Sequence, residues 1–314
     1  MEYNKSLHLQ NVLETHRMRH VQSFVDKMTV KRSEITSFLK QKYGGYAYDP
    51  FNSGSMAKHT ATNVKFDMDI VIPFKHNTFD TLEEMYENVF STLEKEYRNE
   101  ANIIRKQKVS VGIKFPLDKG ESRPIEIDVV PGREPSQNSY LENRDLNIYI
   151  FNPYSCQQSG GMYKKTNIHK QIEYISGKNS ERQIIRLLKI WKKHSDKPYK
   201  SFLIELAVIK AFEQYNGSSG LWERLKYVMN FILNNIADSS FHLYDPGNTN
   251  NDVVVDMGDY DKYSLQSDMA NMLNNIENNP SSYLPYYFPL NEMYSGYAEK
   301  TNGLSFPSSP KRFG

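Results

Sequence analysis

The chain has 314 residues, which is enough to bury a sizeable core in one large domain or in two closely packed ones. Its 39 basic and 37 acidic residues leave a formal charge of +2, which excludes a global field that would attract nucleic acid. A single cysteine, Cys156, excludes an intramolecular disulfide, and no apolar run reaches signal-peptide or membrane-spanning length, so we expect a soluble cytoplasmic protein.

The first forty residues have the periodicity of helices. From about Leu7 to Lys42 apolar residues recur at intervals of three and four, and Gly44-Gly45 ends the run. This pattern predicts one long helix with a break, or two helices in succession. His16 and His20 lie four residues apart without a cysteine or an acidic ligand set nearby, so we interpret them as a solvated helix face.

A glycine–serine turn precedes an alternating strand. Gly54 allows the backbone to approach a ligand closely, and the Ser55 hydroxyl and amide can meet a phosphate oxygen, although such residues also form ordinary polar loops. Alternation predicts a strand over Val64–Ile72. Its apolar residues share one face, and Asp67 and Asp69 lie together on the other, so two carboxylates point the same way.

The following elements predict a small mixed sheet. We expect an amphipathic helix over Thr81–Glu100, then strands over Val109–Phe115 and Ile125–Val130 that form a hairpin. Asp128 lies on the polar face of the second strand, and Glu126 shares that face. Asp-x-Asp pairs are often solvated edge charges, but three carboxylates on two neighbouring strands can hold two divalent cations.

The second half of the chain has the pattern of a helical bundle. A shift in composition after Gln157 predicts a boundary near residues 155–168, and from Asn279 the chain becomes rich in proline and tyrosine. Lys189 lies off the buried stripe of its helix, where it is free to face a cleft or solvent. Helices are predicted over Glu181–Lys193, with Ser180 as the N-cap, and over Phe202–Phe212, Leu221–Ile236 and Leu265–Ile276.

Three patterns together resemble one protein family. The order Gly-Ser, Asp-x-Asp and a later lone Asp is similar to the active-site pattern of the polymerase-beta-like nucleotidyltransferases. Arg-x-x-Leu-Leu-Lys-Ile-Trp followed by Ser-Phe-Leu-Ile-Glu-Leu resembles the core of oligoadenylate synthetase. The Asp245-Pro246 loop matches the Asp-Pro, four residues, Asn-x-Val pattern of the same relatives, with Asp252 where they often carry asparagine. Over roughly residues 40–255, the chain resembles the bacterial cGAS/DncV-like nucleotidyltransferases, or CD-NTases.

The resemblance implies an α+β fold with the active site in a cleft between two parts. The first part, residues 1–160, would be a nucleotidyltransferase palm, a small mixed sheet with helices, and would include the long N-terminal helix. The second, residues 161–300, would be a helical subdomain. Residues 301–314 are expected to form a disordered tail, and Gly314 permits conjugation to another protein without indicating it.

The resemblance also implies roles for individual residues. Asp67 and Asp69 would each ligate both of two Mg²⁺ ions, and Asp128 would ligate the one that activates a ribose hydroxyl; Mn²⁺ would be able to replace Mg²⁺. Glu126 would support Asp128. Phe202 fits either a contact with a base or a core position. The residues expected to bind the nucleotide are Gly54, Ser55, Lys58, Lys189, Ser201 and Phe202.

The implied function is synthesis of a cyclic oligonucleotide from GTP, ATP or both, with release of pyrophosphate. A cyclic dinucleotide is expected, with cyclic di-GMP or another guanine-containing product as the first candidate, acting as a second messenger that activates an effector protein in antiphage defence. We expect a monomer that needs neither a membrane nor a nucleic acid. A linear oligonucleotide synthetase or terminal nucleotidyltransferase is one alternative, and a catalytically inactive nucleotide-sensing protein is the other.

Overall fold

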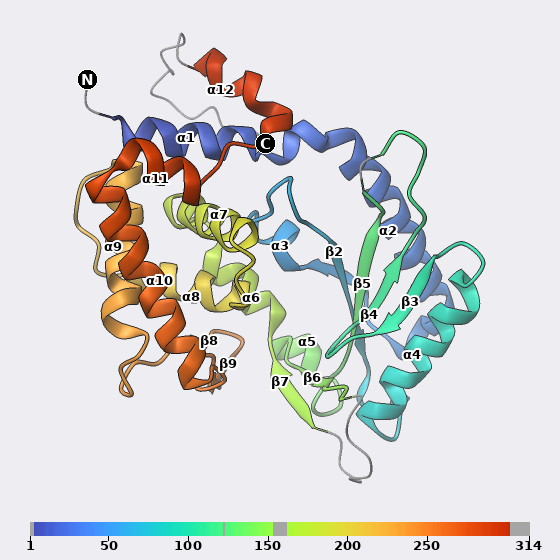
Figure 1. Ribbon diagram of the computed structural model, residues 1–314. Helices are drawn as coiled ribbons and strands as arrows, with labels where there is room; N and C mark the ends of the chain where they lie inside the picture. Colours follow the sequence, from blue (N-terminus) through green and yellow to red (C-terminus); the bar gives the residue numbers. More distant parts are fainter. Residues whose placement is uncertain (1–2, 122, 153–161, 302–314) are drawn as a thin grey trace.

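The computed structural model describes residues 3–121, 123–152 and 162–301, and within them two large hydrophobic cores lie side by side (Figure 1). One core lies under a mixed sheet, and we call the elements around it the sheet half. The other lies among helices, and we call the elements around it the helical half. The predicted α+β class is confirmed, whereas the division at residue 160 stays a prediction.

The centre of the sheet is one parallel pair of strands. β2 (Met68–Phe74) runs parallel to β5 (Glu126–Arg133) and antiparallel to the short β1 (Phe51–Ser53). On its other side β5 pairs antiparallel with β4 (Val111–Lys114), which pairs with β3 (Ile103–Lys106). The predicted hairpin is therefore confirmed as β4 and β5.

Two strands extend the sheet beyond the predicted elements. β6 (Leu146–Tyr149) pairs antiparallel with β5 through Arg133 and Asn147, and β7 (Tyr163–Thr166) pairs with β6. Sequence periodicity missed β7, because its residues are mostly polar and lie partly exposed. The predicted boundary near residues 155–168 thus contains this strand, and a helix, α6 (Ile168–Ile175), begins at its end.

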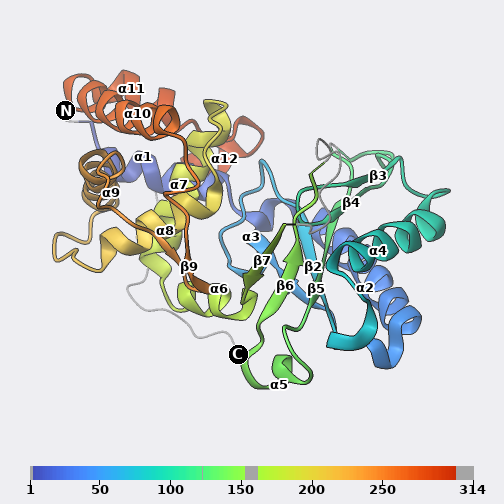
Figure 2. The same ribbon diagram turned by 90° about the horizontal axis from the view of Figure 1, so that it is seen from below.

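Helices cover one face of the sheet. α2 (Gln22–Tyr43) and α4 (Leu82–Tyr97) pack their apolar residues against β2, β4 and β5, and Figures 1 and 2 show both helices on the side away from the helical half. The helix predicted over Thr81–Glu100 is confirmed. Its start is fixed because the Thr81 hydroxyl accepts a hydrogen bond from the backbone N–H of Glu84 at 3.0 Å.

The N-terminal segment forms two helices, which settles the alternative left open by periodicity. α1 (Lys5–Thr15) contributes Leu9 and Val12 to the core of the helical half, and the 3₁₀ helix η1 (Met18–Val21) leads from it to α2 in the sheet half. The interpretation of His16 and His20 as a solvated helix face is wrong. Their ring nitrogens lie 2.8 Å from the carbonyl oxygens of Val12 and Glu14, so both rings are tied to the backbone.

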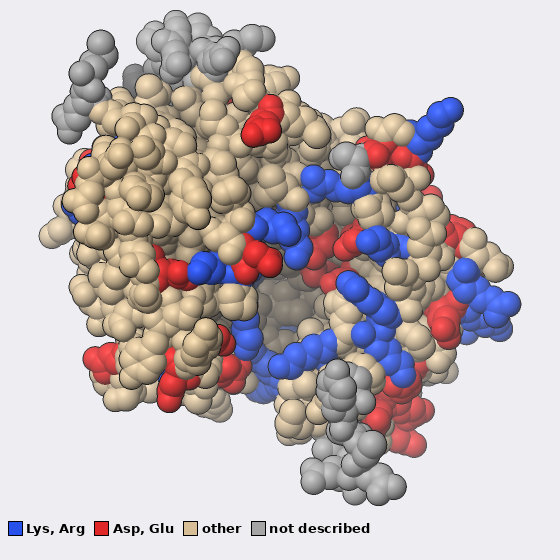
Figure 3. Space-filling view, in the orientation of Figure 1, with Lys and Arg blue, Asp and Glu red and all other residues tan. Residues whose placement is uncertain are grey.

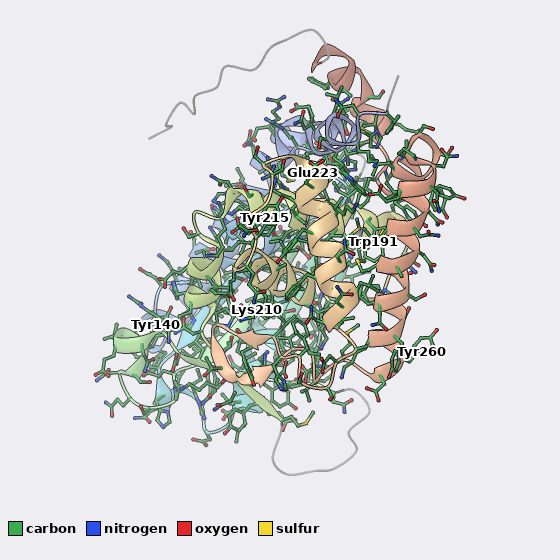
Figure 4. The ribbon with its side chains drawn as sticks, turned by 90° about the vertical axis from the view of Figure 1, so that its left-hand side faces the viewer. Tyr140, Trp191, Lys210, Tyr215, Glu223 and Tyr260 are labelled. Carbon is green, nitrogen blue, oxygen red and sulfur yellow. The ribbon has the colours of Figure 1, made fainter. Side chains whose placement is uncertain are left out.

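The helical half is built around one nearly apolar helix. α8 (Ser201–Phe212) is buried on most sides, and Trp191 of α7, which is 1% exposed, packs in the same core (Figure 4). α7 begins at Asn179 rather than after Ser180; the Ser180 hydroxyl accepts a hydrogen bond from Arg224 instead of capping the helix. The longer helices are α7 (Asn179–His194), α9 (Leu221–Asn235), α10 (Asp259–Asn278) and α11 (Pro280–Tyr287), and α12 (Ser295–Thr301) follows them.

The stretch rich in proline and tyrosine is therefore largely helical, which periodicity did not predict. The remaining short elements are η2 (Gly44–Tyr46), α3 (Gly54–Ala57), η3 (His76–Thr78), α5 (Ser139–Asn143), β8 (Tyr244–Asp245), β9 (Asn248–Asp252) and η4 (Glu292–Tyr294). No helix in the described ranges combines the length and the apolar character needed to cross a membrane. Cys156, Gln157 and residues 302–314 of the tail predicted over 301–314 lie outside the described residues, whereas Thr301 ends α12.

The Asp-Pro loop forms the β8–β9 hairpin. Asp245 is fully buried and accepts hydrogen bonds from the Gln171 side chain at 2.9 Å and from the Gly247 N–H at 2.8 Å. A Cβ at Gly247 would lie 2.6 Å from the carbonyl oxygen of Asn167, so this close approach requires glycine. Asp252 accepts from the backbone N–H groups of Leu243 and Val254, which shows that aspartate fits this position.

Residues 58–63 join the two halves. Asn63, only 1% exposed, donates its side-chain amide to the carbonyl oxygen of Thr15 at 2.9 Å and accepts from the Asn291 amide at 2.9 Å. The Asn63 side chain thus connects a segment of the sheet half with the end of α1 and with the chain beyond α11.

We predict that Asn63→Ala lowers the free energy of unfolding by about 1 to 3 kcal/mol, because buried polar groups on both partners lose their hydrogen bonds. Chemical denaturation measures the change. Asn102→Ala, at an exposed asparagine, is the control and should stay within about 0.5 kcal/mol of the wild type. Equal stability of the two variants would contradict the bridging role.

Candidate active site

Strand pairing aligns the predicted carboxylates. In the parallel ladder Asp69 of β2 lies directly opposite Asp128 of β5, so both side chains leave the sheet on the same face. Asp67 directly precedes β2, because the strand begins at Met68 rather than at Val64. Phe66 and Met68 point into the core under the sheet, as predicted, which leaves the carboxylates on the face toward the helical half.

Burial and neighbouring negative charges raise the pKa of two of the carboxylates, Asp69 and Asp128. Burial, together with the charges of Asp67 and Asp128, raises the pKa of Asp69 to about 7, against the opposing effect of Lys58 and Lys189. Burial and the charge of Asp67 raise the pKa of Asp128 to about 6. Both ionised forms are therefore destabilised in the protein alone, and a bound cation would relieve this.

The donor set fits a hard divalent cation. Carboxylate oxygens on one face of two paired strands are ligands that Mg²⁺ prefers, and Asp67, Asp69 and Asp128 would hold it. Across the described ranges, no three His, Cys, Asp or Glu side chains are gathered closely enough to hold a metal ion as they stand. The fit thus rests on the chemistry and shared face of the three carboxylates.

The glycine–serine turn packs directly against one carboxylate. Gly54 has a φ of +67°, and a Cβ there would lie 1.7 Å from Asp69 Oδ2. Both constraints require glycine, so the backbone of the turn can approach Asp69 in a way that no other residue permits. This brings Ser55 next to the carboxylates.

A cavity of about 350 Å³ lies between the halves and gathers several predicted residues. Ser55 and Asp67 reach it from the sheet half, and Lys189 and Ser201 from the helical half. Figure 3 shows a hollow on this face with Lys and Arg side chains around its mouth. Further residues lining the cavity, which the sequence did not single out, are Thr62, Lys65, Phe66, Lys192, Lys193, Asp196 and Lys197.

The sequence does contain a pattern from which the lysines of α7 in the cavity lining could have been predicted, namely the helical spacing of its basic residues. Lys189, Lys192 and Lys193 recur at intervals of three and four on α7, so they form one basic side of that helix. Lys192 Nζ donates to Ser201 Oγ at 2.9 Å, which fixes this serine at the start of α8.

Lys189 is partly withdrawn from water. Its Nζ donates to the carbonyl oxygen of Thr60 at 2.9 Å, and burial lowers the pKa of its ammonium group to about 8, although Glu205 and Asp67 oppose this change. A half-buried lysine whose main hydrogen-bond acceptor is a neutral carbonyl is suited to binding an anion.

Three of the predicted nucleotide-binding residues, Gly54, Lys58 and Phe202, lie outside the cavity lining. Lys58 is buried and forms an ion pair with Glu205 at 2.7 Å, and its Nζ also lies 4.6 Å from the centre of the Phe202 ring. Phe202 packs against the core of the helical half. The geometry gives Lys58 and Phe202 packing contacts, and the contact of all three residues with nucleotide stays a prediction.

Searches with the sequence identified no relative: neither a family model nor a curated protein matches it. Solved structures do match. The CD-NTase CdnG of Bradyrhizobium diazoefficiens in complex with GTP superposes with a TM-score of 0.70 at 11% identity, over 96% of this chain and 99% of that one.

Two other solved structures match over smaller shares of the two chains. CdnC of E. coli MS115-1, with ATP, has a TM-score of 0.68 at 16% identity, over 90% of this chain and 96% of that one. The Vibrio cholerae DncV cyclic AMP-GMP synthase with nonhydrolyzable GTP has a TM-score of 0.61 at 13% identity, over 79% and 70%. At these identities the likeness is one of fold, and the chain has the fold of the bacterial CD-NTases.

Proposed function

We propose that this protein is a nucleotidyltransferase that joins nucleoside triphosphates into a short cyclic oligonucleotide. The observation that carries the proposal is the cavity in which Ser55 and Asp67 of one half face Lys189 and Ser201 of the other. Asp69, two residues from Asp67, pairs with Asp128 outside the lining of this cavity. The fold of the GTP-bound CdnG and the ATP-bound CdnC supports the same substrate class.

In the proposed reaction, a ribose hydroxyl attacks the α-phosphorus of a triphosphate, and pyrophosphate leaves. Asp67, Asp69 and Asp128 would hold two Mg²⁺ ions, which when bound neutralise charge on the attacking and leaving oxygens. The chain's own residues position the substrate: the ammonium groups of Lys189 and Lys65 face the triphosphate, and the hydroxyls of Ser55 and Ser201 donate to its oxygens.

The product is proposed to be a cyclic dinucleotide, with a guanine-containing one as the first candidate. Such a product would act as a second messenger on an effector protein, and antiphage defence is the proposed setting. Five lysines line the cavity while the whole chain carries only +2, which favours small triphosphates over a long polyanion.

We predict that Asp67→Asn combined with Asp69→Asn abolishes product formation from GTP and ATP with Mg²⁺. The amides lose the negative charge that holds the cations. Mass spectrometry of the reaction mixture measures the product. More than a small percentage of wild-type turnover in this variant would contradict the assignment of these carboxylates.

The single variant Asp69→Asn shows whether the fold survives. Because the pKa of Asp69 is raised to about 7, the folded state holds its proton more tightly than the unfolded chain, and stability falls as the pH rises through the interval up to 7. In EDTA the variant should therefore be more stable than the wild type at pH 8, by about 1 to 3 kcal/mol, and the gain should shrink toward pH 4.

We predict that Lys189→Met weakens nucleotide binding by about 1.5 to 3 kcal/mol, through the loss of charge-assisted hydrogen bonds to the triphosphate. Isothermal titration calorimetry with a nonhydrolysable triphosphate measures the change. Lys210→Met, at an exposed lysine of α8 paired with Glu213, is the control. If Lys189→Met binds the triphosphate as tightly as the wild type, Lys189 does not bind nucleotide, and its hydrogen bond to Thr60 is the role that remains.

The form of the product distinguishes cyclisation from chain extension. Incubation with GTP, ATP or both, in Mg²⁺ or Mn²⁺, should yield a short product that resists phosphatase and forms without added RNA. A ladder of lengthening products would favour the linear synthetase. Nucleotide binding with no product in any mixture would favour an inactive nucleotide sensor.

A further inference from the structure

The turn between β3 and β4 carries a side chain that reaches the third carboxylate. Gln107 lies directly after β3, and its Nε2 donates to Asp128 Oδ1 at 3.1 Å. We infer that Gln107 is a positioning residue, which holds Asp128 in one orientation so that its other oxygen meets the cation. This inference rests on the proposed function of the carboxylates.

The direction of the Gln107 amide is fixed by a second contact. The Ser110 hydroxyl donates to Gln107 Oε1 at 2.9 Å, which leaves the amide NH₂ to face the carboxylate. A carboxylate can only accept, so this is the orientation in which both ends of the amide are satisfied.

The backbone of Gln107 is anchored to a buried helix residue. The Tyr86 hydroxyl of α4, fully buried, accepts from the Gln107 N–H at 3.0 Å and lies 2.7 Å from the Gln107 carbonyl oxygen. The Gln107 N–H also donates to the Ser110 carbonyl oxygen at 2.9 Å, which closes the turn. The position of Gln107 is thus set by the core under the sheet rather than by a mobile loop.

A glycine in the neighbouring strand makes room for the contact between Gln107 and Asp128. Gly112 of β4 lies opposite Asp128, and a Cβ there would come within 2.3 Å of Gln107 Nε2 and 3.1 Å of Asp128 Oδ1. No hydrogen bond from residues 3–121, 123–152 or 162–301 reaches Asp128 Oδ2. Among the described residues, one carboxylate oxygen of Asp128 is thus held by Gln107, and the other is left to accept a cation.

The test compares Gln107→Met, which keeps the length of the side chain and loses both polar ends, with Asp128→Asn. Electron paramagnetic resonance of Mn²⁺, in the presence of a nonhydrolysable GTP analogue, measures cation binding without turnover. In Gln107→Met we expect cation affinity to fall by about tenfold and kcat by about 10- to 100-fold, with KM for the triphosphate changed less than twofold. Ser110→Ala, in which the amide is free to turn over, should give a smaller loss of the same kind.

Gln41→Met, at an exposed glutamine of α2, is the matched control and should behave as the wild type. Wild-type Mn²⁺ affinity in both Gln107→Met and Ser110→Ala would overturn the inference, and so would a lower melting temperature without a change in Mn²⁺ binding. If Gln107→Met does not fold, Ser110→Ala decides alone. If Asp128→Asn binds Mn²⁺ as tightly as the wild type, the proposed function of the carboxylates fails, whatever Gln107 does.

Discussion

The parallel pairing of β2 with β5 is the constraint on which the site depends. It places Asp69 opposite Asp128, although a helix and a hairpin separate the two strands in the chain. A shift of either strand by one residue would turn its carboxylate into the apolar core, because strand side chains alternate. The register is secured by Ile70, Ile72, Ile127 and Val129, all buried on the opposite face. Apolar packing on one face thus determines the carboxylate geometry on the other.

Whether a part of the site could be predicted from the sequence depends on how far apart in the chain the interacting residues lie. Alternation is a local property, so the faces of Asp67, Asp69 and Asp128 could be predicted before their neighbours were known. The contact of Gln107 with Asp128 could not, because it depends on which strands pair and on the length of one turn. The short strands β3 and β7 and the tyrosine-rich α11 are similar cases, since tertiary pairing, rather than their own pattern, determines them.

Lys58 and Lys189 show why residue type alone does not predict a role. Both lie near the carboxylates, and the family resemblance implies nucleotide binding for both. Glu205, from the middle of α8, neutralises Lys58 in a buried ion pair, whereas Lys189 donates to a carbonyl oxygen and lines the cavity. The difference arises from a partner more than a hundred residues away in the chain, which no spacing pattern near Lys58 reveals.

The course of the chain also limits how the cleft can move. α1 belongs to the helical half and α2 to the sheet half, so the backbone passes between the halves at η1 and passes back where β7 meets α6. Residues 58–63 also hold the halves together, through the hydrogen bonds of Asn63 and the buried ion pair of Lys58 with Glu205. An opening that leaves both cores intact would therefore have to bend the chain at the two backbone crossings, η1 and the β7–α6 junction, and would also have to break the contacts of residues 58–63 with the helical half.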